Sequence, residues 1–167
     1  MAPLGTGALP MREMPLPAPL SADDFLGTWE MVSLRRMEDG AFNRFPMGEG
    51  AWGRIIYGPD TMSAFIMSAA WHAGDDVPAF ENLVSYAAHW EFDAGVVRHQ
   101  VLAASVASWI GTTLVRQASR QPDGTLLLCT APHVKKNGAL VHDELLWRRI
   151  DPAKAPMGGA AAPSPSP

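Results

Sequence analysis

The sequence predicts an all-β protein, an eight-stranded antiparallel up-and-down barrel with a short N-terminal helical turn. Eight short segments have the continuous or alternating apolar pattern of strands. Turn sequences rich in Gly, Pro, Asn and Asp separate most of them, and no helical period of useful length interrupts the series. Because these turns join consecutive segments as hairpins, each strand is expected beside its neighbour in the chain, which favours a meander over a Greek key.

The helical turn comes first, over Ser21–Leu26, where Ser21 is the expected cap and two acidic residues occupy the first turn. This turn is expected to close one end of the barrel. The eight strands are expected at Thr28–Arg35, Gly53–Tyr57, Met62–Met67, Ser85–Phe92, Val96–Ala103, Gly111–Ala118, Thr125–Thr130 and Val141–Arg149.

Turn residues connect these strands in chain order. The clearest turns are Gly58-Pro59-Asp60, Asp93-Ala94-Gly95, the Gln-Pro-Asp-Gly run at 121–124, and Asn137-Gly138 before the last strand. The strand pattern lapses between 68 and 82, where a loop with one helical turn at Ala79–Leu83 is expected. Such a loop could lie over a barrel mouth.

Composition limits the chain to one folded domain, expected at 21–150. Of 167 residues, 47% are hydrophobic and 18% are charged, a balance typical of globular proteins. Residues 1–20 are expected to form a flexible Pro-rich leader, and residues 151–167 a disordered Ala/Pro/Ser tail, because neither segment can bury enough apolar surface to become ordered.

Charge and cysteine content narrow the partners and the compartment. The net charge of −4 is small and the Lys and Arg residues are scattered, so no nucleic-acid partner is expected. No apolar run is long enough to span a bilayer, so no membrane partner is expected. Cys129 is the only cysteine, and the leader lacks the pattern of a signal peptide, which favours the cytoplasm. The oligomeric state is left open.

Four short motifs in this order resemble the bacterial and fungal lipocalin-like domain proteins over about Leu26 to Ile150. They are Leu-Gly-Thr-Trp-Glu-Met-Val-Ser at 26–33, Gly-Arg-Ile-Ile-Tyr-Gly-Pro-Asp at 53–60, Trp-Ile-Gly-Thr at 109–112 and Leu-Trp-Arg-Arg at 146–149. The resemblance implies eight antiparallel strands around a ligand cavity. It also implies that Arg148 or Arg149 packs on Trp29, a cation–π contact at the closed end.

The resemblance also implies two kinds of activity. Some lipocalin-like proteins bind hydrophobic molecules, and some act as cofactor-free cyclases or isomerases beside natural-product pathways. The chain departs from the family where relatives tend to have His-His-Val-Glu in the fifth strand, because it has His99-Gln100-Val101-Leu102 and keeps only the first histidine. The segment between the third and fourth strands is also shorter than in the family.

Strand alternation indicates which polar side chains face the barrel interior. His99 belongs to the more apolar series of its strand, with Val97 and Val101, and is expected to point inward. In the last strand the series containing Asp143 and Trp147 is the more apolar, although the series of His142, Glu144 and Leu146 is a credible alternative. His99 and Asp143 together are candidate catalytic residues, because a carboxylate can orient an imidazole for proton transfer. The alternative is a satisfied hydrogen bond in the core.

Aromatic and methionine side chains are the best candidates for a cavity wall, because Met and aromatic rings adapt to irregular apolar ligands. Filling of the core remains an alternative role for most of them. The candidate ligand-binding residues are Phe65, Met67, Tyr86, Trp90, His99, Trp109 and Arg116.

Other motifs do not indicate a further site. Gly48–Gly53 matches the dinucleotide pattern G-x-G-x-x-G, but it precedes a strand and opens no helix. The five histidines have no local spacing typical of a ligand pair, so no metal is expected unless a site is assembled across strands. Cys129 lies in an apolar strand and is expected to be an inert core thiol.

These observations favour a barrel that binds a small, largely hydrophobic molecule without a cofactor. The alternative is a cofactor-independent cyclase or isomerase that acts on a polyketide- or terpenoid-like intermediate of secondary metabolism, since restricting a substrate's conformation needs no nucleophile. A third hypothesis is an interaction barrel with a filled core.

Overall fold

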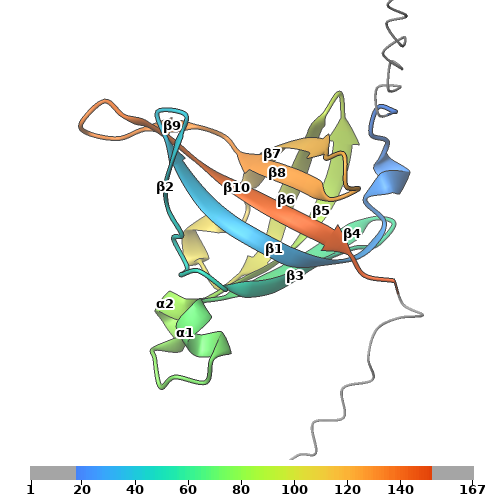
Figure 1. Ribbon diagram of the computed structural model, residues 1–167. Coiled ribbons are helices and arrows are strands. Elements are labelled where there is room, and N and C mark those ends of the chain that lie inside the picture. Colours follow the sequence, from blue (N-terminus) through green and yellow to red (C-terminus); the bar gives the residue numbers. More distant parts are fainter. Residues whose placement is uncertain (1–17, 152–167) are drawn as a thin grey trace, which may run out of the picture.

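The computed structural model describes residues 18–151, in which the eight expected strands form one closed antiparallel barrel (Figure 1). Nearly all of the expected leader and tail lie outside the described residues. The barrel strands are β1 (Gly27–Glu38), β3 (Trp52–Tyr57), β4 (Thr61–Met67), β5 (Leu83–Asp93), β6 (Val96–Ala104), β7 (Thr113–Arg120), β8 (Leu126–Thr130) and β10 (Leu140–Arg149).

The first and last barrel strands close the sheet. β1 pairs with β3 along one side and with β10 along the other, from Trp29 opposite Arg149 to Glu38 opposite Val141. All other barrel strands pair with their neighbours in the chain. The up-and-down order expected from consecutive hairpins is therefore confirmed.

Two short strands that the sequence pattern did not predict extend the sheet at one end of the barrel. β2 (Ala41–Arg44) folds back on the end of β1, and β9 (His133–Val134) pairs with the start of β10. Asp39 and Gly40 both have positive φ, as a tight hairpin turn requires. Both strands are exposed throughout, so they lack the apolar alternation by which a strand is recognised.

Four short helical segments complete the described part of the chain. They are the 3₁₀ turns η1 (Ala22–Asp24) and η2 (Ala107–Trp109) and the one-turn helices α1 (Ala69–His72) and α2 (Ala79–Asn82). The N-terminal turn is confirmed, with the Asp24 carboxylate accepting hydrogen bonds from the backbone and hydroxyl of Ser21. The segment expected as a loop contains α1 as well as α2, because Ser68 caps α1 through the amide of Trp71. No helix among the described residues is long and apolar enough to cross a membrane.

The helical segments lie at opposite ends of the barrel. Figure 1 shows η1, in blue, at the end where β10 finishes, and α1 and α2 at the other end. At the η1 end, four aromatic rings fill the barrel interior, and we call these rings the aromatic plug. Its members are Phe25, Tyr57, Trp90 and Phe92, with ring centroids 4.8 to 5.7 Å apart in the contacting pairs.

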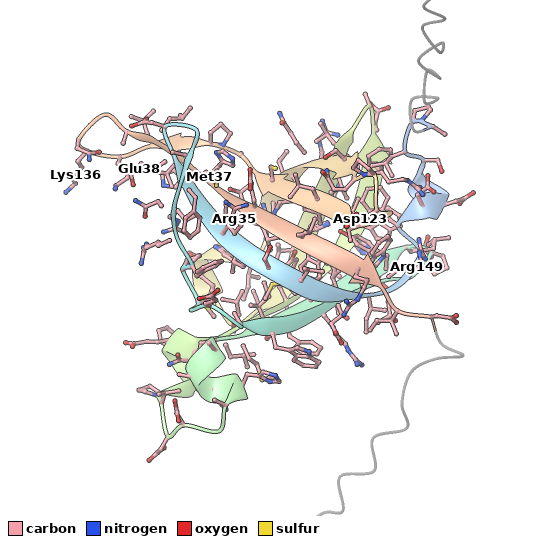
Figure 2. All side chains as sticks on the ribbon, in the orientation of Figure 1. Arg35, Met37, Glu38, Asp123, Lys136 and Arg149 are labelled. Atoms are coloured by element: carbon pink, nitrogen blue, oxygen red, sulfur yellow. The ribbon has the colours of Figure 1, made fainter. Side chains whose placement is uncertain are left out.

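Contacts of Arg149 with Trp29 and with the N-terminal turn stabilise this closed end. The Arg149 guanidinium lies 4.4 Å from the centre of the Trp29 ring and also donates hydrogen bonds to the backbone oxygens of Asp24 and Leu26. Gly27 has a φ of +114°, and a Cβ there would lie 3.0 Å from the Arg149 side chain, so glycine suits this position. Of the two candidate arginines, Arg149 therefore makes the expected cation–π contact. Figure 2 shows Arg149 far from Glu38, because Arg149 pairs with Trp29 near the start of β1 and Glu38 is the last residue of that strand.

Candidate ligand cavity

A cavity of about 260 Å³ occupies the half of the barrel that the aromatic plug leaves free. This volume is just below the ~300–1,000 Å³ typical of ligand pockets. Apolar side chains from β1, β3, β4, β8 and β10 form most of its wall, among them Leu34, Ile55, Ala64, Ile66, Leu128 and Leu145. Met47, whose backbone oxygen accepts a hydrogen bond from the amide of Ala69 in α1, lines it at the end opposite η1.

His99 lies between the aromatic plug and the cavity, held by two tyrosines. Its Nε2 is 2.9 Å from the hydroxyl of Tyr57 in the plug, and its Nδ1 is 2.9 Å from the hydroxyl of Tyr86 in the cavity wall. The imidazole is fully buried. Both ring nitrogens are therefore engaged by protein groups.

Burial keeps this cluster uncharged at neutral pH. Desolvation lowers the pKa of His99 to about 3, and the nearby Arg116 charge lowers it further in the same direction. Desolvation raises the pKa of Tyr86 to about 12, against a smaller opposing effect of Arg116. His99 is consequently a neutral imidazole, and Tyr86 keeps its phenolic proton.

A row of polar side chains crosses the cavity wall on neighbouring strands; we call it the polar belt. Its members are Arg116 on β7, Thr130 on β8, Asp143 on β10 and Arg36 on β1. Arg116 lies opposite Thr130, the Thr130 hydroxyl accepts a hydrogen bond from the amide of Asp143, and Asp143 lies opposite Arg36. The belt follows from one inward position on each strand.

The two arginines of the polar belt differ in their partners. Arg36 binds Asp143 through two hydrogen bonds of 2.7 and 2.8 Å, a fork-to-carboxylate pair with both side chains partly buried. Arg116 donates to the backbone oxygen of its neighbour Val115, and no carboxylate among the described residues forms an ion pair with it. The belt therefore contains one balanced charge pair and one arginine without a carboxylate.

Five predicted site residues line this cavity and three do not. Those in the wall are Tyr86, His99, Trp109, Arg116 and Asp143. Trp90 belongs to the aromatic plug, where its indole Nε1 donates to the backbone oxygen of Gly58. The expectation that Phe65 and Met67 line the cavity is wrong, because the inward residues of β4 are Met62, Ala64 and Ile66.

Phe65 has an outer-face partner that explains its position. Its ring contacts that of Trp52 at a centroid distance of 5.5 Å, and the Trp52 ring stacks on the imidazole of His72. Only the last three residues of β4, 65–67, are apolar on both faces, so alternation did not distinguish inside from outside there, although Thr61 and Ser63 mark the outer face at the start of the strand. In β10 the distinction was correct, since Val141 and Trp147 are 1% exposed.

Sequence reasoning missed Arg36, Tyr57 and Trp147 as cavity or near-cavity polar groups. Arg36 lies next to a second arginine at the end of an expected strand, where charged residues are usually solvated. The inward alternation of Trp147 was recognised, and its indole nitrogen could have been counted as a buried donor. Tyr57 could have been identified only from its contact with His99, which is 42 residues away in the chain.

A second polar cluster lies away from the cavity lining. Ligand atoms of Cys129, His142 and Glu144 lie within 4.8 Å of one another across β8 and β10. His142 Nε2 is 3.7 Å from a Glu144 oxygen, within ion-pair range if the imidazole is protonated. Burial and the Glu144 charge raise the pKa of the Cys129 thiol, which agrees with the expectation of an inert side chain. The expectation that Cys129 lies in the core is wrong, because it is only half-buried and alternates with the buried Leu126 and Leu128 of β8.

Comparison with known proteins identifies the family more clearly than the activity. A family model described as a lipocalin-like domain matches residues 26–150. No functionally curated protein matches the chain. Among solved structures, the monomer form of the M. tuberculosis PknI sensor domain is similar, with 16% identity over 81% of this chain and 90% of that chain and a TM-score of 0.30. A likeness of that degree carries no argument about function.

Proposed function

Because the chain belongs to the lipocalin-like domain family, we propose that it binds a small, largely hydrophobic molecule inside its barrel. The observation that carries this proposal is the cavity of about 260 Å³ between the aromatic plug and the α1 and α2 end. Its wall is mostly aliphatic and aromatic, with a few polar groups at fixed positions, which is the usual composition of a small-molecule site.

The same geometry supports binding more than proton transfer by the residues considered for catalysis. His99 has no free nitrogen to offer a substrate, since Tyr57 and Tyr86 hold both. The Asp143 carboxylate is bound through both oxygens by Arg36, so both are already engaged by a protein group. A cyclase or isomerase acting through these two residues would first have to break those contacts.

Binding of a neutral fluorescent probe, N-phenylnaphthylamine, tests the proposal. We expect one probe per chain and energy transfer from tryptophan, because Trp109 and Trp147 line the cavity. Ala64→Phe places a ring in the cavity and should abolish binding. Ser63→Phe is the matched control, because Ser63 is the exposed neighbour of Ala64 on β4.

Melting temperatures of both variants must be measured beside the binding, since an oversized side chain can strain a packed interior. Folded Ala64→Phe protein that binds the probe as well as the parent would contradict the proposal. Failure of the parent protein to bind would contradict it as well.

A further inference from the structure

The direction of the hydrogen bonds around His99 follows from the surroundings of Tyr57. Within the described chain, the Tyr57 hydroxyl has one hydrogen-bond partner, His99 Nε2, and the Phe25 and Trp90 rings pack against the Tyr57 ring. A neutral imidazole donates through one nitrogen and accepts through the other. If Nε2 carried the proton, the buried Tyr57 proton would have no acceptor, at a cost of about 1–3 kcal/mol.

Tyr57 therefore donates to Nε2, and the His99 proton resides on Nδ1. That proton is donated to the hydroxyl oxygen of Tyr86, 2.9 Å away. The Tyr86 proton is then not used by His99, and Tyr86 lines the cavity. The chain from Tyr57 through His99 to Tyr86 thus presents an O–H donor to whatever occupies the cavity.

A second donor without a partner lies in the same wall. The indole Nε1 of Trp147 is buried and has no hydrogen-bond acceptor among the described residues, although the Trp147 side chain lines the cavity. Buried donors nearly always have partners in folded proteins. The Tyr86 hydroxyl proton and the Trp147 indole N–H consequently both lack an acceptor among the described residues, and a ligand in the cavity can supply one.

The charge of the cavity wall also indicates a ligand that accepts hydrogen bonds. Asp143 is neutralised by Arg36, so Arg116 is left as the uncompensated charge of the lining. The Arg116 charge acts on Tyr57, Tyr86 and His99, so it lies close to the hydrogen-bond chain. A cation in a partly enclosed apolar wall attracts an anion more strongly than it would in water.

We infer that the ligand is an apolar molecule ending in an oxyanion, a carboxylate in the simplest case, whose oxygens accept hydrogen bonds from Tyr86 and Arg116. The apolar part then lies against the aliphatic wall formed by Leu34, Ile66 and Leu145. This inference rests on the proposed binding function and adds the chemical class of the ligand. It assigns Arg116 and Tyr86 as the residues that determine specificity.

Competition between two ligands of equal chain length tests it. Decanoate and decanol are each titrated against bound N-phenylnaphthylamine at about pH 7.5, where decanoate is ionised. A purely apolar cavity would favour decanol, because a carboxylate loses much more hydration on burial. We expect decanoate instead to displace the probe at a concentration about tenfold lower than decanol, the gain from charge-assisted hydrogen bonds.

Substitutions then locate the preference. Arg116→Gln should remove the preference for decanoate, so that decanol becomes the better competitor of the probe bound to the same variant. Tyr86→Phe should weaken decanoate about three- to tenfold, for the loss of one hydrogen bond. Arg98→Gln is the matched control, because Arg98 alternates with the buried Val97 and His99 of β6 and belongs to the outward series.

The outcomes separate the inference from the function on which it rests. Equal competition by the two ligands, or a decanoate preference that survives Arg116→Gln, overturns the inference and leaves hydrophobic binding intact. Absence of probe binding by the parent protein overturns both. The comparison in the parent protein needs no substitution, so it remains decisive if either variant fails to fold.

Discussion

The Tyr57 hydroxyl lies 2.9 Å from Nε2 of His99 in a part of the core that contains no other partner for it among the described residues. The two residues come from β3 and β6, on different parts of the barrel wall. Their contact joins the aromatic plug to the cavity wall, so the protonation of one buried imidazole determines which hydrogen bonds the cavity can offer.

The first prediction concerns the tautomer of His99. Long-range ¹H–¹⁵N NMR spectra should show Nδ1 protonated and Nε2 unprotonated, because Tyr57 must donate to Nε2. The assignment should persist from pH 8 to about pH 4, since burial lowers the pKa of His99 to about 3. A proton on Nε2 would remove the argument for a free Tyr86 donor.

The second prediction concerns stability against acid. An unfolded His99 binds a proton below about pH 6.5, whereas the folded one remains neutral down to about pH 3. The unfolded state therefore binds more protons in this window, and the free energy of unfolding falls as the pH falls through it. The slope due to His99 approaches about 1.4 kcal/mol per pH unit.

Denaturant titrations of the parent and His99→Gln between pH 7 and pH 4 isolate this contribution, because the carboxylates titrate in both proteins. The parent should lose stability more steeply on acidification than the variant does. Parallel curves would mean that the imidazole is protonated in the folded state or that it is accessible to water.

The third prediction concerns the closed end. Trp29→Ala removes a large buried ring and should lower the free energy of unfolding by roughly 3–5 kcal/mol. Arg149→Met should cost about 1–3 kcal/mol, because it removes the cation–π contact and leaves two backbone oxygens at η1 without their donor. Thermal or denaturant unfolding measures both changes.

Arg148→Met is the control for Arg149. Arg148 forms an exposed ion pair with Glu30 at 3.3 Å, the kind of contact that contributes ~0–1 kcal/mol. Equal losses for the two arginine variants would contradict the assignment of Arg149 as the residue that locks the closed end.

The sequence by itself determined the eight barrel strands, their order and most of the inward faces, but not the short exposed strands β2 and β9. Alternation of apolar residues is a local property, and it placed His99 and Asp143 inside because their neighbours two positions away are apolar. It was misleading on β4, where Phe65 packs on Trp52 outside while the small Ala64 faces the cavity. The polar Thr61 and Ser63 mark the outer face only at the start of β4, and the apolar run at its end does not show which side chains face the interior.

Only the tertiary structure decided how far along the barrel axis each inward side chain lies. Tyr86 and Trp90 share one face of β5, yet Tyr86 lines the cavity and Trp90 belongs to the aromatic plug. The difference arises because η1 brings Phe25 over one end and fills it. Periodicity identifies a face and carries no information about which end of the barrel another segment will cover.

Closure of the barrel likewise decided which interior polar groups contact one another. Arg36 and Asp143 are 107 residues apart and meet because β1 pairs with β10 in one register, and His99 meets Tyr57 because β3 and β6 face one interior. Local sequence specifies each of these side chains as polar and places two of them inside. Which charge is balanced, which donor is left over and hence what the cavity can bind depend on contacts across the closed barrel, and these exist only once the first and last strands have paired.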